Sequence, residues 1–124
     1  SLVGKFGTPM RSSYSASKHA LHGFFDTLRA EHHDDNIKVT VVCPGFINTK
    51  VSINALTADG SPQGSMDEAT GKGLSPEVLA RKMLTAIARE KEEVLIGKKE
   101  VLGVYVKRFF PRLFSKIVRK AKVT

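Results

Sequence analysis

Tyr14-Ser15-Ala16-Ser17-Lys18 is the stretch of sequence from which the fold is inferred. A Tyr and a Lys four residues apart on a helix lie one above the other on the same face. An ammonium group beside a phenol favours the phenolate, so it lowers the pKa of a tyrosine from about 10 toward neutral pH. Such a phenol can exchange a proton with an alcohol while another group moves a hydride. Aromatic–Lys pairs at this spacing are also common surface contacts, so the pair alone leaves both interpretations open.

Two features outside this stretch favour chemistry. Ser1 lies thirteen positions before Tyr14, and Pro44-Gly45-Phe46-Ile47-Asn48-Thr49 follows a strand-like run. Taken in order, Ser1, Tyr14-x-x-x-Lys18 and Pro44-Gly45-x-x-x-Thr49 resemble the catalytic half of a short-chain dehydrogenase/reductase. Gly4-Lys5 and the residues from Tyr14 to Phe25 are similar to the branch that holds the 11β-hydroxysteroid dehydrogenases and the dehydrogenase/reductase member 7 group. The resemblance covers about residues 1–97.

The resemblance implies an α/β fold, the C-terminal part of a Rossmann-type doubly wound parallel sheet whose first half is absent. The sequence contains no G-x-G-x-x-G motif, which would hold a cofactor pyrophosphate. The family places this motif, and a catalytic Asn, before the catalytic Ser. We therefore expect the chain to be the C-terminal half of a longer protein, and neither to fold stably nor to catalyse alone.

The resemblance also implies an oxidoreductase that transfers a hydride between a nicotinamide cofactor and a carbonyl or alcohol. In the family's mechanism Tyr14 protonates the developing alkoxide, and Ser1 hydrogen-bonds the carbonyl oxygen. Lys18 supports the tyrosine and holds the nicotinamide ribose. We expect a small lipophilic substrate, and we favour NADP over NAD by analogy alone.

Residues 37–43 are rich in β-branched side chains and predict a buried parallel strand that Pro44-Gly45 ends. Ligands of open α/β sheets bind beyond the carboxyl ends of the strands. In the family, the backbone after Pro-Gly meets the nicotinamide amide and the Thr reaches the cofactor, roles that Ile47 and Thr49 match. Without the resemblance, the same residues indicate a plain strand-ending turn. The expected cofactor-binding residues are Tyr14, Lys18, Pro44, Gly45, Ile47 and Thr49.

The remaining elements of residues 1–97 follow from periodicity and capping. The catalytic helix is expected over about 13–33, with the face of Tyr14, Lys18, Leu21, Phe25 and Leu28 on a sheet. Residues 50–74 predict a lid loop, and its Val51, Ile53, Leu56 and Met66 are candidates for lining a pocket. Ser75-Pro76 begins a helix that reaches about Arg89, and a strand follows at 94–96. The two strands and this helix predict a right-handed parallel βαβ unit.

A second helix stripe, Ala16, Ala20, Phe24 and Thr27, is mostly small. Periodicity alone leaves open whether it packs within one subunit or against a second one. In the resembled family this face forms the dimer interface, so we expect a homodimer. Cys43 is expected to be a small buried hydrophobe.

No metal site is expected from the spacing of the metal-binding residue types. The chain has four histidines, His19, His22, His32 and His33. No Cys or carboxylate joins them at a recognised ligand spacing.

The segment 98–124 differs in charge from the rest of the chain. Residues 1–97 hold eleven Lys/Arg and eleven Asp/Glu, whereas residues 98–124 hold nine Lys/Arg and only Glu100. The net charge of +8 therefore belongs to this tail. Apolar residues recur within it at near-helical spacing, and Pro111 interrupts them. They are Leu102, Val106, Phe109, Phe110, Leu113, Ile117 and Val118.

Two interpretations of the tail stay open. A basic amphipathic helix can lie on an anionic membrane surface. Alternatively, the helix packs on its own domain through Phe109 and Phe110. A nucleic-acid partner is not expected, because no known motif is present. The alternatives to an enzyme are thus a non-catalytic dimerising protein and a membrane-surface module, and the endoplasmic reticulum surface and the cytoplasm both stay open as locations.

Overall fold

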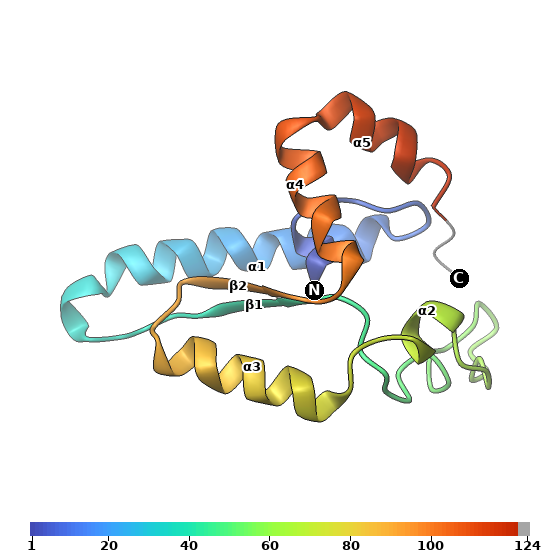
Figure 1. Ribbon diagram of the computed structural model, residues 1–124, viewed down its shortest axis with the longest axis horizontal. Coiled ribbons are helices and arrows are strands. Elements are labelled where there is room, and N and C mark those ends of the chain that lie inside the picture. Colours follow the sequence, from blue (N-terminus) through green and yellow to red (C-terminus); the bar gives the residue numbers. More distant parts are fainter. Residues whose placement is uncertain (122–124) are drawn as a thin grey trace.

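The computed structural model of the protein describes residues 1–121. A two-stranded parallel sheet lies between two helices, α1 on one face and α3 on the other (Figure 1). The elements in chain order are η1 (Leu2–Gly4), α1 (Ser12–Glu31), η2 (His33–Asp35), β1 (Val41–Pro44), α2 (Glu68–Gly71), α3 (Pro76–Ala88), β2 (Glu93–Ile96), η3 (Lys99–Val101), α4 (Leu102–Phe109) and α5 (Pro111–Val118). The expected α/β class is confirmed.

The sheet pairs Val41 with Glu93 at one end and Pro44 with Ile96 at the other. Helix α3 connects the two strands, and Ser75 caps it by accepting a hydrogen bond from the Val78 N–H. The expected strand over 37–43 is wrong in its bounds, because the chain becomes a strand only at Val41. A residue is held in a strand by pairing with its neighbour strand, and the register with β2 begins at the pair Val41–Glu93.

The small core lies where the helices cover the sheet. The buried hydrophobic residues are Leu2, Cys43, Ala86, Ile96 and Phe114. Cys43 is 1% exposed, as expected for a buried hydrophobe. The covered face of α1 follows Ser15, Lys18, His22, Phe25 and Leu28.

This face is rotated slightly from the expected stripe. Tyr14 and Leu21 lie at its margin, 44% and 43% exposed. The rotation carries Ser15 and His22 toward the sheet in their place.

The segment that follows β1 is pinned at both ends. Ile47 and Leu74 form a parallel bridge, in which the Leu74 N–H donates to the Phe46 carbonyl and the Asn48 N–H donates to the Leu74 carbonyl. Gly73 is needed here, because an added Cβ would lie 2.5 Å from the Phe46 carbonyl oxygen. The side chains of Val51 and Leu56, two of the four pocket candidates, are largely exposed.

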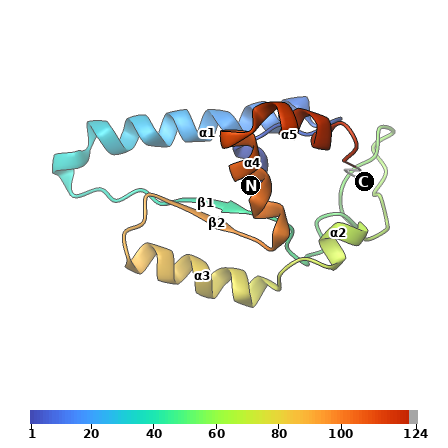
Figure 2. The same ribbon diagram turned by 45° about the horizontal axis from the view of Figure 1, so that its top comes forward.

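The tail forms two short helices that Pro111 separates, and α5 crosses the end of α4 (Figure 2). Their contact with the body is aromatic: the Phe114 and Phe6 ring centroids are 5.2 Å apart. Of the two interpretations left open for the tail, packing through Phe109 and Phe110 is not what the structure shows, because both side chains are more than 60% exposed. Pro111 restarts the helix in a new direction, so a different side chain faces the body. Within residues 1–121, every helix is too short or too polar to cross a bilayer.

Candidate active site

Tyr14 and Lys18 lie on the first two turns of α1. The Lys18 ammonium is 5.4 Å from the centroid of the Tyr14 ring. Figure 1 shows that the start of α1, the carboxyl ends of both strands and the segment leading to α2 share one end of the molecule. The Tyr–Lys pair therefore lies at the end of the sheet where ligands of parallel α/β proteins bind.

Ser1 is held beside this pair by η1. Its hydroxyl accepts a hydrogen bond from the Val3 N–H at 3.2 Å, and η1 packs against both α1 and β1. The approach is close at Gly4, where an added Cβ would lie 3.1 Å from the Lys18 carbonyl oxygen and 2.8 Å from Nε2 of His22. A glycine at this position therefore brings the Ser1 segment against the catalytic helix.

The predicted cofactor residues begin at Pro44, the last residue of β1, and continue through Thr49 directly beyond the strand. The Gly45 N–H donates to the Ile96 carbonyl, so the chain leaves the sheet in register with β2. The Thr49 hydroxyl accepts from the Val51 N–H at 3.4 Å. Among residues 1–121 no hydrogen bond joins this segment to Ser1, Tyr14 or Lys18, although the two groups share an end of the sheet.

Glu100 is a site neighbour that the sequence analysis missed. Its carboxylate accepts a hydrogen bond from the Phe46 N–H at 3.2 Å and lies against Gly45 and Gly97, the residues that follow the two strands. A Cβ on either glycine would collide with this carboxylate. The sequence did contain a signal for this role of Glu100. A glycine follows each strand, and Glu100 is the single acidic residue of the basic tail.

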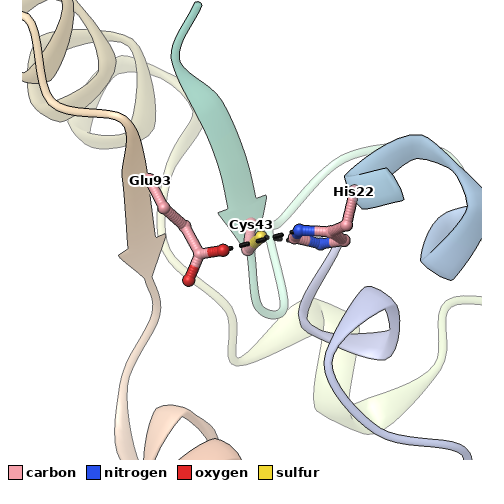
Figure 3. Close-up of side chains that lie close together, drawn as sticks. All are labelled: His22, Cys43 and Glu93. Atoms are coloured by element: carbon pink, nitrogen blue, oxygen red, sulfur yellow. Dashed lines mark hydrogen bonds and ion pairs between the residues drawn. The ribbon is translucent and has the colours of Figure 1, made fainter. Parts of the chain in front are cut away.

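A polar cluster lies deeper between α1 and the sheet, and Figure 3 shows the side chains of His22, Cys43 and Glu93 directed toward one another. The Cys43 sulfur is 3.7 Å from Nε2 of His22, and Nδ1 of His22 is 3.4 Å from the Glu93 carboxylate. Lys5 pairs with the same carboxylate at 2.8 Å. The spacing of the histidines in the sequence gave no sign of this cluster, because the fold brings together residues far apart in sequence.

Burial sets the ionisation of this cluster. It lowers the pKa of His22, and the neighbouring Lys5 ammonium lowers that pKa further. Burial also raises the pKa of the Cys43 thiol. Both groups are therefore held in their neutral forms, which are the forms that a buried site tolerates.

The outward face of α1 carries the predicted dimer stripe. Ala16, Ala20, Phe24 and Thr27 are all exposed, and Phe24 is 63% exposed. Its ring packs edge-on against Phe25, with centroids 5.1 Å apart. A second subunit could therefore reach this face without displacing the sheet.

Comparisons with known proteins agree with these features. A family model described as "short chain dehydrogenase" matches residues 1–59. Dehydrogenase/reductase SDR family member 7B of Bos taurus is 45% identical over 119 residues, which are 95% of this chain and 37% of the relative. Dehydrogenase/reductase SDR family protein 7-like of Anopheles gambiae is 46% identical over 121 residues, 97% of this chain and 38% of the relative.

The chain thus spans less than two fifths of the length of these relatives. The matched residues include Ser1, Tyr14, Lys18 and the Pro44–Thr49 segment within the family model's range. Residues 1–59 thus match the short-chain dehydrogenase family, and nearly the whole chain is similar to the SDR family member 7B and 7-like proteins.

Proposed function

We propose that this chain supplies the catalytic residues of an NAD(P)-dependent oxidoreductase that interconverts a small lipophilic carbonyl compound and its alcohol. The observation that carries the proposal is the Lys18 ammonium 5.4 Å from the Tyr14 ring, at the end of the sheet where a cofactor binds. The Tyr14 hydroxyl donates a proton to the substrate oxygen during reduction. Ser1 donates a hydrogen bond to the same oxygen and stabilises the charge that develops there.

The residues present fit a nicotinamide cofactor, which supplies the hydride when bound. Within residues 1–121, Lys18 forms no ion pair, so its ammonium is available for ribose hydroxyls. The Phe46 carbonyl and the Asn48 N–H both form hydrogen bonds with the backbone of Leu74. In an extended chain, the backbone N–H and carbonyl groups of successive residues point to opposite sides. The Ile47 N–H and carbonyl therefore face away from Leu74, where they suit a carboxamide. NADP is proposed over NAD by family analogy only.

Tyr14→Phe in the longer protein tests the mechanism. The substitution keeps the ring and removes the proton donor, so we expect carbonyl reduction to fall about 100-fold or more while cofactor affinity stays nearly unchanged. Lys18→Met should weaken cofactor binding as well, because Lys18 has both roles. Tyr105→Phe is the matched control, since the only other tyrosine lies in the tail. Near-normal turnover in Tyr14→Phe would reject the mechanism.

The 124-residue chain by itself should not bind NADPH measurably. It has no glycine-rich loop for the pyrophosphate, and we propose that this loop belongs to the longer protein. Isothermal titration of the purified chain checks this expectation. Micromolar binding would show that the whole cofactor site lies within residues 1–124.

We propose that the longer protein forms a homodimer through Ala16, Ala20, Phe24 and Thr27. The exposure of these small side chains on one face supports close helix approach. Ala20→Glu places a charge in that interface and should shift sedimentation from dimer to monomer. Ala80→Glu on the exposed side of α3 is the control. A dimer that persists in Ala20→Glu would place the contact elsewhere.

A specific observation favours a second role, attachment of the tail to an anionic membrane surface. Six large apolar side chains of α4, α5 and the residue between them are at least half exposed: Leu102, Tyr105, Phe109, Phe110, Leu113 and Ile117. Lys107, Arg108, Arg112 and Lys116 lie among them. Each such cation contributes roughly 1 kcal/mol near an anionic bilayer at low salt, and the apolar side chains add burial.

Vesicle sedimentation tests this second role. We expect binding to vesicles that contain phosphatidylserine, weaker binding in high salt, and loss of most binding in the double variant Phe109→Ser, Phe110→Ser. Leu84→Ser is the control, because Leu84 is an equally exposed apolar residue of α3. Unchanged sedimentation of the double variant would contradict the membrane role.

A further inference from the structure

The cluster of His22, Cys43 and Glu93 has no part in the proposed hydride transfer. One residue comes from α1, one from β1 and one from β2, and their side chains converge in the space between the helix and the sheet (Figure 3). One ligand atom from each lies within 4.8 Å of the others. A nitrogen, a sulfur and a carboxylate oxygen are the three donor types that zinc takes in proteins.

We propose that His22, Cys43 and Glu93 bind a zinc ion. Two atoms bound to one tetrahedral zinc, a histidine nitrogen and a cysteine sulfur, lie about 3.6 Å apart for typical bond lengths. The Cys43 sulfur and Nε2 of His22 are 3.7 Å apart without an ion. Nε2 is therefore the nitrogen that binds, and Glu93 exchanges its contact with Nδ1 for the ion. A water completes the fourth position.

The charges of the site balance with and without the ion. Without zinc, the Glu93 carboxylate is paired with the Lys5 ammonium at 2.8 Å, and the thiol and imidazole are neutral. With zinc, two positive charges meet one carboxylate and one thiolate, and the thiol proton leaves to solvent. The Lys5 side chain is already 29% exposed, so its ammonium can turn to water as the ion replaces it.

The same three residue types also form nucleophile–base–carboxylate triads. That interpretation fails here because Cys43 is 1% exposed, so a substrate does not reach its sulfur. Zinc needs only an ion-sized space. Its binding would join α1 to both strands one helical turn after Lys18 and thereby stabilise the helix that carries the Tyr–Lys pair.

Cobalt titration of the 124-residue chain tests the proposal, under conditions where circular dichroism shows helix. A thiolate bound to Co²⁺ gives an intense charge-transfer absorption that an imidazole or carboxylate alone does not give. We expect this absorption to appear at one equivalent and to disappear when Zn²⁺ is added. Cys43→Ser should abolish it, and His22→Ala or Glu93→Gln should weaken binding at least about 100-fold.

Two further variants make the result specific. Lys5→Met removes the competing ammonium and should tighten cobalt binding severalfold. His19→Ala should change nothing, because His19 lies on the same helix with Nδ1 on the Ser15 carbonyl instead. Absence of the thiolate band in the helical wild-type chain, or cobalt affinity unchanged in Cys43→Ser, would overturn the proposal. The readout involves no nicotinamide, so it is independent of the oxidoreductase proposal.

Discussion

The body of residues 1–97 and the tail of residues 98–121 handle their apolar side chains in opposite ways. The body surrounds its sheet with two helices and buries Leu2, Cys43, Ala86 and Ile96. The tail buries one large side chain, Phe114, and leaves six others at least half exposed. The body carries no net charge, whereas residues 98–124 carry the chain's net charge of +8.

This difference shows that hydrophobic content alone does not say what a segment packs against. In the body, apolar residues and paired charges meet across α1, β1 and β2. In the tail, large apolar side chains and basic side chains are both exposed, and the aromatic contact of Phe114 with Phe6 joins its helices to the body.

The largest test of this comparison is Phe114→Ala. Truncation of a buried aromatic side chain costs about 3–5 kcal/mol, so the tail should lose its attachment to the body. Hydrogen exchange of the α4 and α5 amides should accelerate while β1 and β2 keep their protection. Phe109→Ala is the matched control, since its exposed ring should change stability by less than about 0.5 kcal/mol. If the two substitutions change stability and hydrogen exchange equally, Phe114 does not attach the tail to the body more strongly than an exposed residue does.

A smaller effect is expected inside the body, at its glycines. Gly4→Ala inserts a methyl group against the Lys18 carbonyl and the His22 ring and should cost about 1–3 kcal/mol in urea denaturation. Gly23→Ala is the opposite case, because an added Cβ there meets nothing within 4 Å and the site is inside a helix. It should stabilise the protein by roughly 0.5–1 kcal/mol. If both changes destabilise equally, the close packing of η1 on α1 is not what holds Ser1 in place.

The smallest expected effect is on how folding stability depends on pH. We expect this dependence to arise in the body, because all four histidines lie there. Burial holds the pKa of His22 below its ordinary value of 6.5. The unfolded chain therefore binds a proton on this residue before the folded chain does, and stability falls as pH drops below about 6.5. Urea denaturation at pH 5.5 and 7.5 should show a smaller difference in His22→Gln than in wild type. An unchanged difference would assign the acid sensitivity to other groups.

The sequence was sufficient for the elements whose signals are local. Ser75-Pro76 predicted the start of α3 to the residue, and Pro111 predicted the break between α4 and α5. The class of fold followed from the family resemblance, and the parallel pairing followed from strand-like runs on either side of a helix. The strand at 37–43 was predicted too long, because composition does not reveal how many partner residues a strand meets.

The parts that could not be predicted depend on contacts distant in sequence. Phe114 lies outside the apolar repeat read through the tail, since Pro111 resets the direction of the helix. His22 and Cys43 are 21 positions apart, and no spacing rule connects them. The roles of Ser1, Tyr14, Lys18, Ile47 and Thr49 stay predictions, because no substrate or cofactor contact tests them.

The bridge between Ile47 and Leu74 has a consequence for how new specificities could evolve on this framework. The bridge joins the two ends of the loop between Ile47 and Leu74 to each other, so the ends are held independently of the residues within the loop. Doubling the length of such a loop adds only about 0.6 kcal/mol of closure entropy. For the lid loop predicted over 50–74, insertions and deletions would therefore reshape what the protein recognises while the residues on α1 and beyond β1 keep their positions. Selection can therefore act on recognition and on chemistry as separate traits.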